Sequence, residues 1–169
     1  MKDLLEQIQT ASRAGQYYVA LMSALAVPEI CGALESPGGE ADGKKYAAWF
    51  DTHVSPRYAV RGTTMLHGWD VYRFRCRMLH QPTHNIPTTG LSRIVFIEPG
   101  MSGVVPHNHK VFDMLNIDVR IFIEDVAEGA LLWLERAQHT PLFAGNVERF
   151  ARRYPDGLPP YIAGSAIIA

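Results

Sequence analysis

Four side chains that suit phosphate chemistry lie close together in residues 72–80, "YRFRCRMLH". Arg73, Arg75 and Arg77 alternate with other residue types, and His80 ends the stretch. The guanidinium group is permanently charged, and its planar fork of N–H donors matches a phosphate group. The imidazole group titrates near neutral pH, so it can accept or donate a proton during a reaction. Together these residue types could hold a phosphodiester and transfer a proton beside it.

The backbone of this stretch decides which of these side chains meet. Alternation of arginine with apolar residues is typical of a β-strand with one charged face. A helix is the competing interpretation, because Trp69, Tyr72, Cys76 and Leu79 fall within about 80° of one another on a helical wheel. We favour the helix, because it can run from Leu66 to the Gln81-Pro82 boundary, about four turns, which is long for a strand. Arginine, methionine and leucine are also good helix formers.

The predicted helix has a second apolar face and two charged flanks. The second face consists of Val71, Phe74 and Met78, one flank carries Arg75, and the other flank carries Arg73, Arg77 and His80. One apolar face must contact the domain core. The other needs a further partner, and a second copy of the chain related by a two-fold axis would bring the same helix alongside itself. We therefore expect a homodimer.

Length, composition and charge describe an ordinary globular chain. Its 169 residues suffice for one domain with a full core. Its net charge of -1 argues against a constitutive nucleic-acid coat protein, which would usually be more basic. Cys31 and Cys76 form no disulfide framework, which is typical of a reducing cytoplasm. The N-terminus resembles no signal peptide, and we see no apolar run of the roughly 18 residues that span a membrane.

The remaining pattern predicts a mainly α fold. We expect a helix over residues 3–26, a short helix restarting at Pro28, and a third helix over 44–54. Strands are expected at 92–98 and 111–117, as a small β-hairpin inserted at about 92–117. A long helix then starts at Asp118 or Asn116 and ends near Ala137. Its apolar stripe is Val119, Phe122, Ile123, Val126, Ala130, Trp133 and Leu134.

The chain end is predicted to form a short helix and an irregular tail. The helix is expected from Asn146 to about Arg153, and the tail follows as "YPDGLPPYIAGSAIIA". The apolar residues at its end suggest that the tail docks on the helices. We thus expect one domain, with a helical part over 1–140 and the short helix and docked tail over 141–169.

A helix in which four to six residues separate an arginine from a following histidine resembles the motif of the HEPN superfamily. Four residues separate Arg75 from His80, and six separate Arg73 from His80. The order of elements is also similar, with an N-terminal helix pair, a mid-chain motif helix and a long closing helix, "DVRIFIEDVAEGALLWLE". The resemblance covers about residues 1–140. "ICGALESP", "GKKYAAWF" and "RYPDGLPPY" are similar to segments of uncharacterised bacterial proteins without a known activity.

The resemblance to the HEPN superfamily implies a helical bundle and a metal-independent endoribonuclease, often a toxin or a defence effector. Two motif helices would form one cleft in a homodimer, and an antitoxin could be a further partner. Arg75 would hold the scissile phosphate, and His80 would act as the general base or acid at the ribose 2′-hydroxyl group. Arg73, Arg77 and His84 would contribute to substrate binding.

Two other interpretations remain open. The position after the motif arginine is commonly polar in active HEPN proteins, but here it is Cys76. The chain could therefore be a HEPN-like interaction or nucleotide-binding module without catalysis. It could also be an unrelated helical phage or accessory protein, whose arginines pair with carboxylates on neighbouring helices.

Histidines raise the question of a metal site. His107 and His109 flank Asn108, and on a strand this spacing would place both rings on one side. A second pair, His80 and His84, has the spacing of neighbours on a helix. Pro82 interrupts the second pair, and no cysteine or carboxylate obviously completes either set. We expect no metal and no cofactor.

Overall fold

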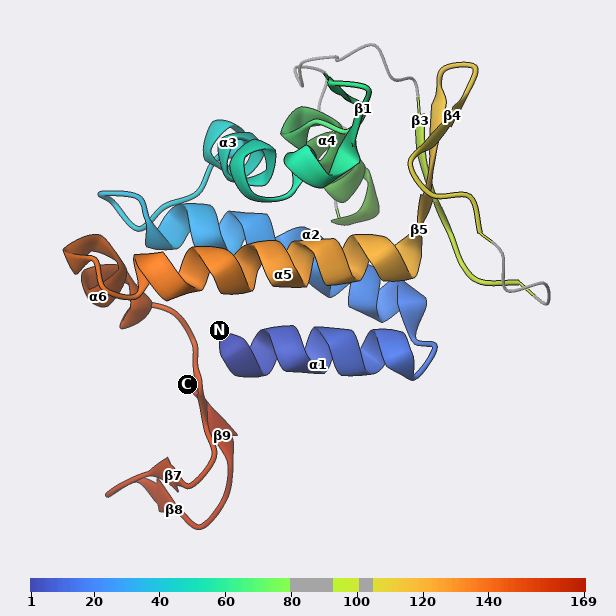
Figure 1. Ribbon diagram of the computed structural model, residues 1–169. Helices are drawn as coiled ribbons and strands as arrows, with labels where there is room; N and C mark the ends of the chain where they lie inside the picture. Colours follow the sequence, from blue (N-terminus) through green and yellow to red (C-terminus); the bar gives the residue numbers. More distant parts are fainter. Residues whose placement is uncertain (80–92, 101–104) are drawn as a thin grey trace.

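A computed structural model describes residues 1–79, 93–100 and 105–169, and it confirms a mainly α fold (Figure 1). The α-helices of this part are α1 (Lys2–Arg13), α2 (Tyr17–Leu34), α3 (Gly43–His53), α4 (Gly68–Leu79), α5 (Val119–Ala137) and α6 (Pro141–Val147). A short 3₁₀ helix, η1 (Ser55–Tyr58), and a hairpin of β1 (Ala59–Val60) and β2 (Thr63–Thr64) join α3 to α4.

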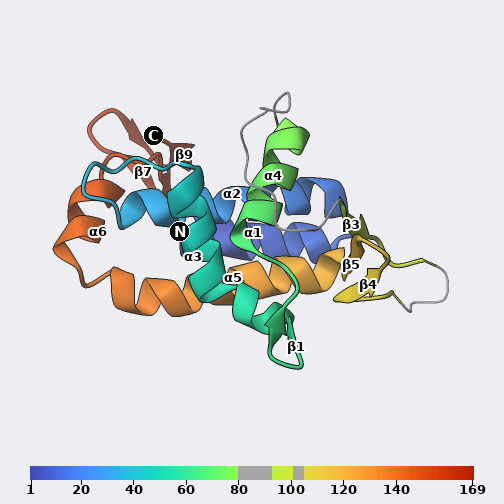
Figure 2. The same ribbon diagram turned by 90° about the horizontal axis from the view of Figure 1, so that it is seen from above.

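The long helices α2 and α5 lie side by side at the centre, with α1 on one side of them and α3 and α4 on the other (Figures 1 and 2). The helix α2 has neighbours on most of its sides, which explains why it is apolar nearly all round. It is also long and apolar enough to cross a membrane by length and composition, so the expectation that no apolar run reaches that length is wrong. However, 56% of it is buried, and burial of this kind is typical of a core helix.

The helix predicted over residues 3–26 is wrong, because the chain divides there into α1 and α2. Gly15 has a φ of 76°, a left-handed conformation that glycine adopts readily. The amide of Gln16 donates to the carbonyl of Ala11 at 2.9 Å, and the amide of Gly15 donates to the carbonyl of Ser12 at 3.0 Å. This pair of hydrogen bonds is the Schellman motif, which ends α1 and lets α2 fold back on it.

The predicted break at Pro28 is also wrong, because α2 continues through this residue to Leu34. Proline lacks the amide hydrogen that would donate to the carbonyl four residues earlier, which weakens an isolated helix. In α2 the residues around it are buried, including Val27 and Cys31, each at most 1% exposed. Tertiary packing on both sides of Pro28 therefore outweighs the missing hydrogen bond.

Three strands form a small sheet at one end of α5. They are β3 (Arg93–Ile97), β4 (His109–Val111) and β5 (Met114–Asp118), in the order β3-β5-β4. The predicted pairing of the first and last strands as a hairpin is wrong, because β3 and β5 run parallel. The hairpin is instead formed by β4 and β5, whose two-residue turn contains Phe112 at a φ of 55°. A parallel pair needs a crossover, and the chain between Ile97 and Met114 supplies it.

The prediction of the long helix is confirmed, and Asp118 is its N-cap. The Asp118 carboxylate accepts a hydrogen bond from the Arg120 amide at 2.9 Å, and the Arg120 guanidinium group donates to it at 2.6 Å. All residues of the predicted apolar stripe are buried. Burial alone raises the pKa of Asp118, but the hydrogen bonds from Arg120 outweigh it and hold the pKa below its usual value.

Replacing Asp118 should make stability less sensitive to acid. A carboxyl group with a depressed pKa in the folded state stabilises the fold above its unfolded pKa, about 3.9. That contribution is lost as the pH falls through the lower folded pKa. At neutral pH we expect Asp118→Ala to lower the free energy of unfolding by about 1 kcal/mol. Urea denaturation between pH 7 and 2 checks this. Asp118→Asn keeps a capping oxygen, so this variant should lose only the pH-dependent part of the contribution of Asp118 to the free energy of unfolding.

The predicted last helix is displaced in the structure. It spans Pro141–Val147 instead of Asn146 to Arg153, because the Thr140 hydroxyl group accepts from the Phe143 amide and caps it. Asn146 is buried near the end of α6, and its amide group donates to the Ser36 carbonyl at 2.7 Å.

The tail forms two short strand pairs. The first joins β6 (Arg153–Tyr154) to β9 (Ile167–Ile168), and the second joins β7 (Gly157–Leu158) to β8 (Ile162–Ala163). The base of this arm contacts α1, where Arg153 lies 3.9 Å from the Asp3 carboxylate. Beyond its base the arm extends away from the helices (Figure 1), and Tyr161 is 83% exposed. The expected docking therefore holds only for the base.

Candidate functional site

The stretch that carries the arginines is a helix, as predicted. The helix α4 begins at Gly68, two residues later than the expected start at Leu66. Its predicted end at Gln81-Pro82, together with His80 and His84, lies outside the described residues. The described part of the motif comprises Arg73, Arg75 and Arg77.

Arg75 is held in an ion pair with Glu29 of α2. Only 13% of its side chain is exposed, and it lies near the buried Tyr46, whose hydroxyl group donates to the Leu25 carbonyl at 2.9 Å. Burial raises the pKa of Tyr46, although the positive charge of Arg75 opposes this rise. In the described part of the chain, Arg75 therefore joins α4 to α2, because its guanidinium group is paired with the Glu29 carboxylate.

Loss of the Arg75 side chain should destabilise the fold. We expect Arg75→Ala to leave the Glu29 carboxylate without its partner and to lower the free energy of unfolding by about 1–2 kcal/mol. In a double-mutant cycle with Glu29→Gln, the coupling should be at most about 1 kcal/mol, because Glu29 is 39% exposed and solvent screens the pair. Urea unfolding measures both quantities. Arg77→Ala is the matched control and should change stability by less than about 0.5 kcal/mol; equal losses for the two arginines would contradict this assignment.

Arg73 is also engaged with the protein. Its guanidinium group lies 3.8 Å from the Asp70 carboxylate one turn earlier, and 15% of its side chain is exposed. The Asp70 carboxylate in turn accepts from the His67 amide at 3.2 Å, which secures the start of α4. Arg73 thus makes a contact within α4, and Arg75 makes a contact between α4 and α2.

Arg77 differs from the other two arginines, because it is exposed and lines a groove. The groove has a volume of about 440 Å³ and lies between the start of α2, the last turns of α4, strand β3 and the first residue of α5. Its lining consists of Tyr17, Tyr18, Leu21, Phe74, Arg77, Met78, Ile94, Val95, Phe96, Glu98 and Val119.

Aromatic and aliphatic side chains form most of the groove. Phe74 of α4 meets Phe96 of β3 edge to face at 4.8 Å between ring centroids, and Phe96 meets the buried Phe122 at 4.7 Å. The second apolar face predicted for α4 thus packs on the sheet of its own chain. The homodimer expected from that face stays a prediction.

The groove also carries one group of each charge. Arg77 and Glu98 are both exposed, and neither forms an ion pair with another described residue. Tyr18 is 64% exposed, so its ring is accessible from solvent. The groove therefore offers aromatic surface, one guanidinium group and one carboxylate to the same ligand.

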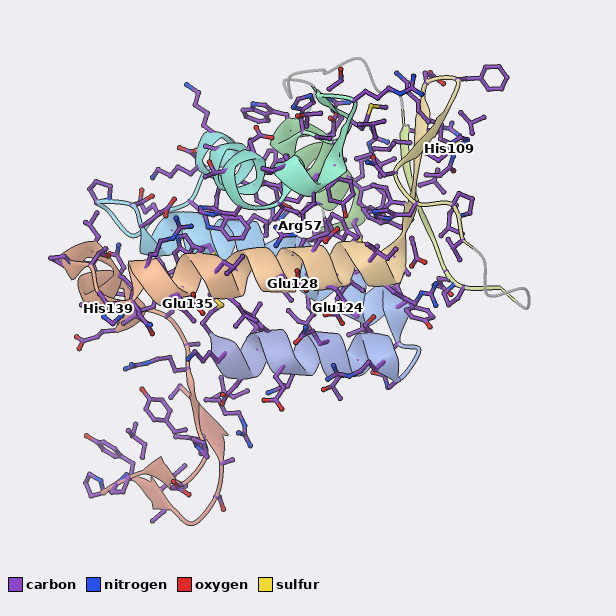
Figure 3. The ribbon with its side chains drawn as sticks, in the orientation of Figure 1. Arg57, His109, Glu124, Glu128, Glu135 and His139 are labelled. Atoms are coloured by element: carbon purple, nitrogen blue, oxygen red, sulfur yellow. The ribbon has the colours of Figure 1, made fainter. Side chains whose placement is uncertain are left out.

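Of the four histidines singled out earlier, His107 and His109 lie in the part of the chain that the structure describes, and they have no cluster of other metal-ligating side chains around them there. His107 packs against Tyr58 with 5.5 Å between ring centroids, and His109 is exposed at the start of β4 on the hairpin (Figure 3). Burial lowers the pKa of His107. Within residues 1–79, 93–100 and 105–169, no group of three or more histidine, cysteine or acidic side chains is placed to hold a metal ion.

Sequence reasoning singled out Arg77, Phe74 and Met78 on α4 but did not place the residues of α2 and β3 that form the groove with them. Tyr17 and Tyr18 were assigned to the interior of one long helix, whereas they begin α2 after the turn at Gly15. The signal that could have placed them is "RAGQYY", a helix-ending glycine followed by two tyrosines. The position of Glu98 in the groove depends on the parallel pairing of β3 with β5, which the sequence did not predict.

No protein-family model, curated protein or solved structure matches this chain. The resemblance to the HEPN superfamily therefore stays a prediction.

Proposed function

We propose that the chain binds a nucleotide, or an unpaired nucleotide of RNA, in the groove between α2, α4 and β3. The observation that carries this proposal is the exposed Arg77 at the rim of a groove with aromatic walls. Proteins bind unpaired bases by stacking them on aromatic side chains and by contacting the backbone phosphate with arginine. The groove combines both features, with Tyr18 at the start of α2 and Arg77 near the end of α4.

The size and lining suit one base with its sugar. A volume of about 440 Å³ lies in the range of small-molecule sites, which are mostly apolar with few polar groups. The exposed ring of Tyr18 supplies a stacking surface, and Glu98 supplies an acceptor for a ribose hydroxyl group or for amino groups of a base. Arg77 then faces the phosphate, with which a guanidinium group forms paired hydrogen bonds.

Binding to short single-stranded RNA tests this proposal. We expect Tyr18→Leu to weaken binding by about 1–3 kcal/mol, because leucine keeps apolar volume but loses the stacking surface. Fluorescence anisotropy with a labelled oligonucleotide measures the change. Tyr161→Leu, in the exposed arm, is the matched control and should bind as wild type does. No binding by wild type, or equal losses in both variants, would reject the groove as the site.

Ribonuclease activity is the second candidate, and the helical structure of α4 favours it. On a helix, Arg73 and Arg77 lie one turn apart on the same flank, and the chain continues from Leu79 directly to His80. As a HEPN-like bundle, the chain would be a bacterial cytoplasmic toxin or defence effector that acts as a homodimer and is neutralised by an antitoxin. His80 would move the proton at the 2′-hydroxyl group, with Arg75 at the phosphate. Arg75 would first have to exchange the Glu29 carboxylate for that phosphate.

Cleavage assays in EDTA distinguish binding from catalysis. If the chain is a ribonuclease, wild type cleaves RNA without metal, and His80→Ala abolishes cleavage but retains binding. If the chain only binds, neither protein cleaves and Tyr18→Leu still weakens binding. Growth arrest on expression, relieved by His80→Ala, would support a toxin.

A further inference from the structure

A second cleft lies at the opposite end of α1, between that helix and the base of the C-terminal arm. Its volume is about 550 Å³. The lining consists of Met1, Lys2, Asp3, Leu4, Gln7, Ile30, Phe150, Ala151, Arg152, Arg153 and Ile168. This cleft shares no lining residue with the groove beside α4, so a ligand here does not depend on the proposed function.

The charges around this cleft are unbalanced. Among the lining side chains, Lys2, Arg152 and Arg153 carry three positive charges and Asp3 carries one negative charge, so the side chains of the cleft sum to +2, whereas the net charge of the chain is -1. Asp3 and Arg153 lie 3.9 Å apart and are both about half exposed, so their pairing is weak. Lys2 has no ion-pair partner within the described residues. The rim therefore favours an anion.

The floor of the cleft is apolar and continuous with the core. Ile30 and Phe150 pack against the buried core cluster, while Leu4 and Ile168 form the more exposed walls. Three of these four side chains are aliphatic. A flexible alkyl chain fits such walls better than a flat heteroaromatic ring, which prefers aromatic faces.

The strand pairing places cationic and apolar groups on the same side. Arg153 of β6 lies directly opposite Ile168 of β9, and directly opposed residues of an antiparallel pair project from one face. Both side chains line the cleft. The backbone of Arg152 is hydrogen-bonded in both directions to Ala169, at 2.7 Å and 3.0 Å, which fixes this arrangement.

We propose that this cleft binds an organic anion with an alkyl chain, such as an acyl carboxylate or an alkyl phosphate. The alkyl chain lies on Leu4, Ile30 and Ile168, where it leaves water, and the anionic head faces Lys2 and Arg153. An inorganic anion gains nothing from the floor, and an uncharged alkane leaves the basic rim without a partner.

Calorimetric titrations of the full chain with four probes test this proposal. Decanoate and decyl phosphate carry both features, decanol lacks the charge, and inorganic phosphate lacks the chain. We expect one or both alkyl anions to bind at least about tenfold more tightly than decanol, and inorganic phosphate not to bind measurably. Which of the two anions binds more tightly identifies the head group as carboxylate or phosphate.

Two variants locate the site. Arg153→Gln and Ile168→Ser should each weaken binding of the preferred anion by about tenfold without unfolding the chain, because both side chains are exposed. Arg13→Gln removes a charge at the far end of α1 and should bind as wild type does. Absence of binding by both alkyl anions, equal affinity for decanol, or unchanged affinity in both cleft variants would overturn the proposal. Arg77→Gln should retain this binding, which separates the two sites.

Discussion

Gly68→Ala should strongly destabilise the fold, because Gly68, the first residue of α4, lies directly against the backbone of α3. A Cβ atom at this position would lie 2.3 Å from the Ala47 carbonyl oxygen and 2.5 Å from the Ala47 Cα atom. Backbone atoms cannot rotate aside as a flexible side chain does, so the two helices must separate. We expect the free energy of unfolding to fall by about 3 kcal/mol or more, a large share of the stability of a single domain.

Urea or thermal denaturation measures this loss. Gly145→Ala is the matched control, because Gly145 lies in α6 and a Cβ atom there would meet nothing within 4 Å. In a helix, alanine is favoured over glycine, so the control should be neutral or stabilising by up to about 1 kcal/mol. Similar unfolding midpoints for the two variants would show that α3 and α4 do not pack as closely as described.

Arg77→Gln should have the largest effect on ligand binding of the substitutions on α4. A hydrogen bond between charged groups contributes roughly 1.5–3 kcal/mol, so its loss should weaken RNA or nucleotide binding by about tenfold to a hundredfold. Stability should be nearly unchanged, because the side chain is exposed and forms no ion pair with another described residue. Replacing Arg75 should instead lower stability and leave ligand binding nearly unchanged, since the partner of Arg75 is Glu29 of the protein itself.

Titrations at several salt concentrations measure the effect of Arg77→Gln. Loss of one phosphate contact should reduce the slope of log affinity against log salt by about one. Arg136→Gln, on the last turn of α5, removes the same charge away from the groove and should leave affinity and slope unchanged. Equal weakening by the two substitutions would indicate a general effect of net charge and would remove Arg77 from the site.

The helices were predictable from sequence where local signals and packing agree. The apolar stripe of α5 repeats at the helical period, and Asp118 caps it, so both its start and its burial followed from sequence. Likewise the length of the arginine-bearing stretch favoured a helix over a strand. At Pro28 the local signal was opposed by packing, and packing decided the outcome.

The groove could not be predicted, because it depends on contacts between distant segments. Tyr18, Arg77 and Phe96 lie far apart in sequence and meet only after the turn at Gly15 and the parallel pairing of β3 with β5. Parallel pairing leaves no local signature, since its crossover separates the two strands. Whether an arginine pairs with a carboxylate or faces a groove likewise depends on a neighbouring helix, as Arg75 and Glu29 show.

Photocrosslinking tests the groove most directly. A short RNA carrying 4-thiouridine would be bound to the full chain and irradiated, and the crosslinked peptides identified by mass spectrometry. The groove predicts crosslinks within Tyr17–Leu21 at the start of α2 or within the β3 segment, and their loss in Arg77→Gln at the same RNA concentration. Crosslinks confined to other surfaces, or crosslinks unaffected by Arg77→Gln, would contradict the proposal that this groove holds the nucleotide.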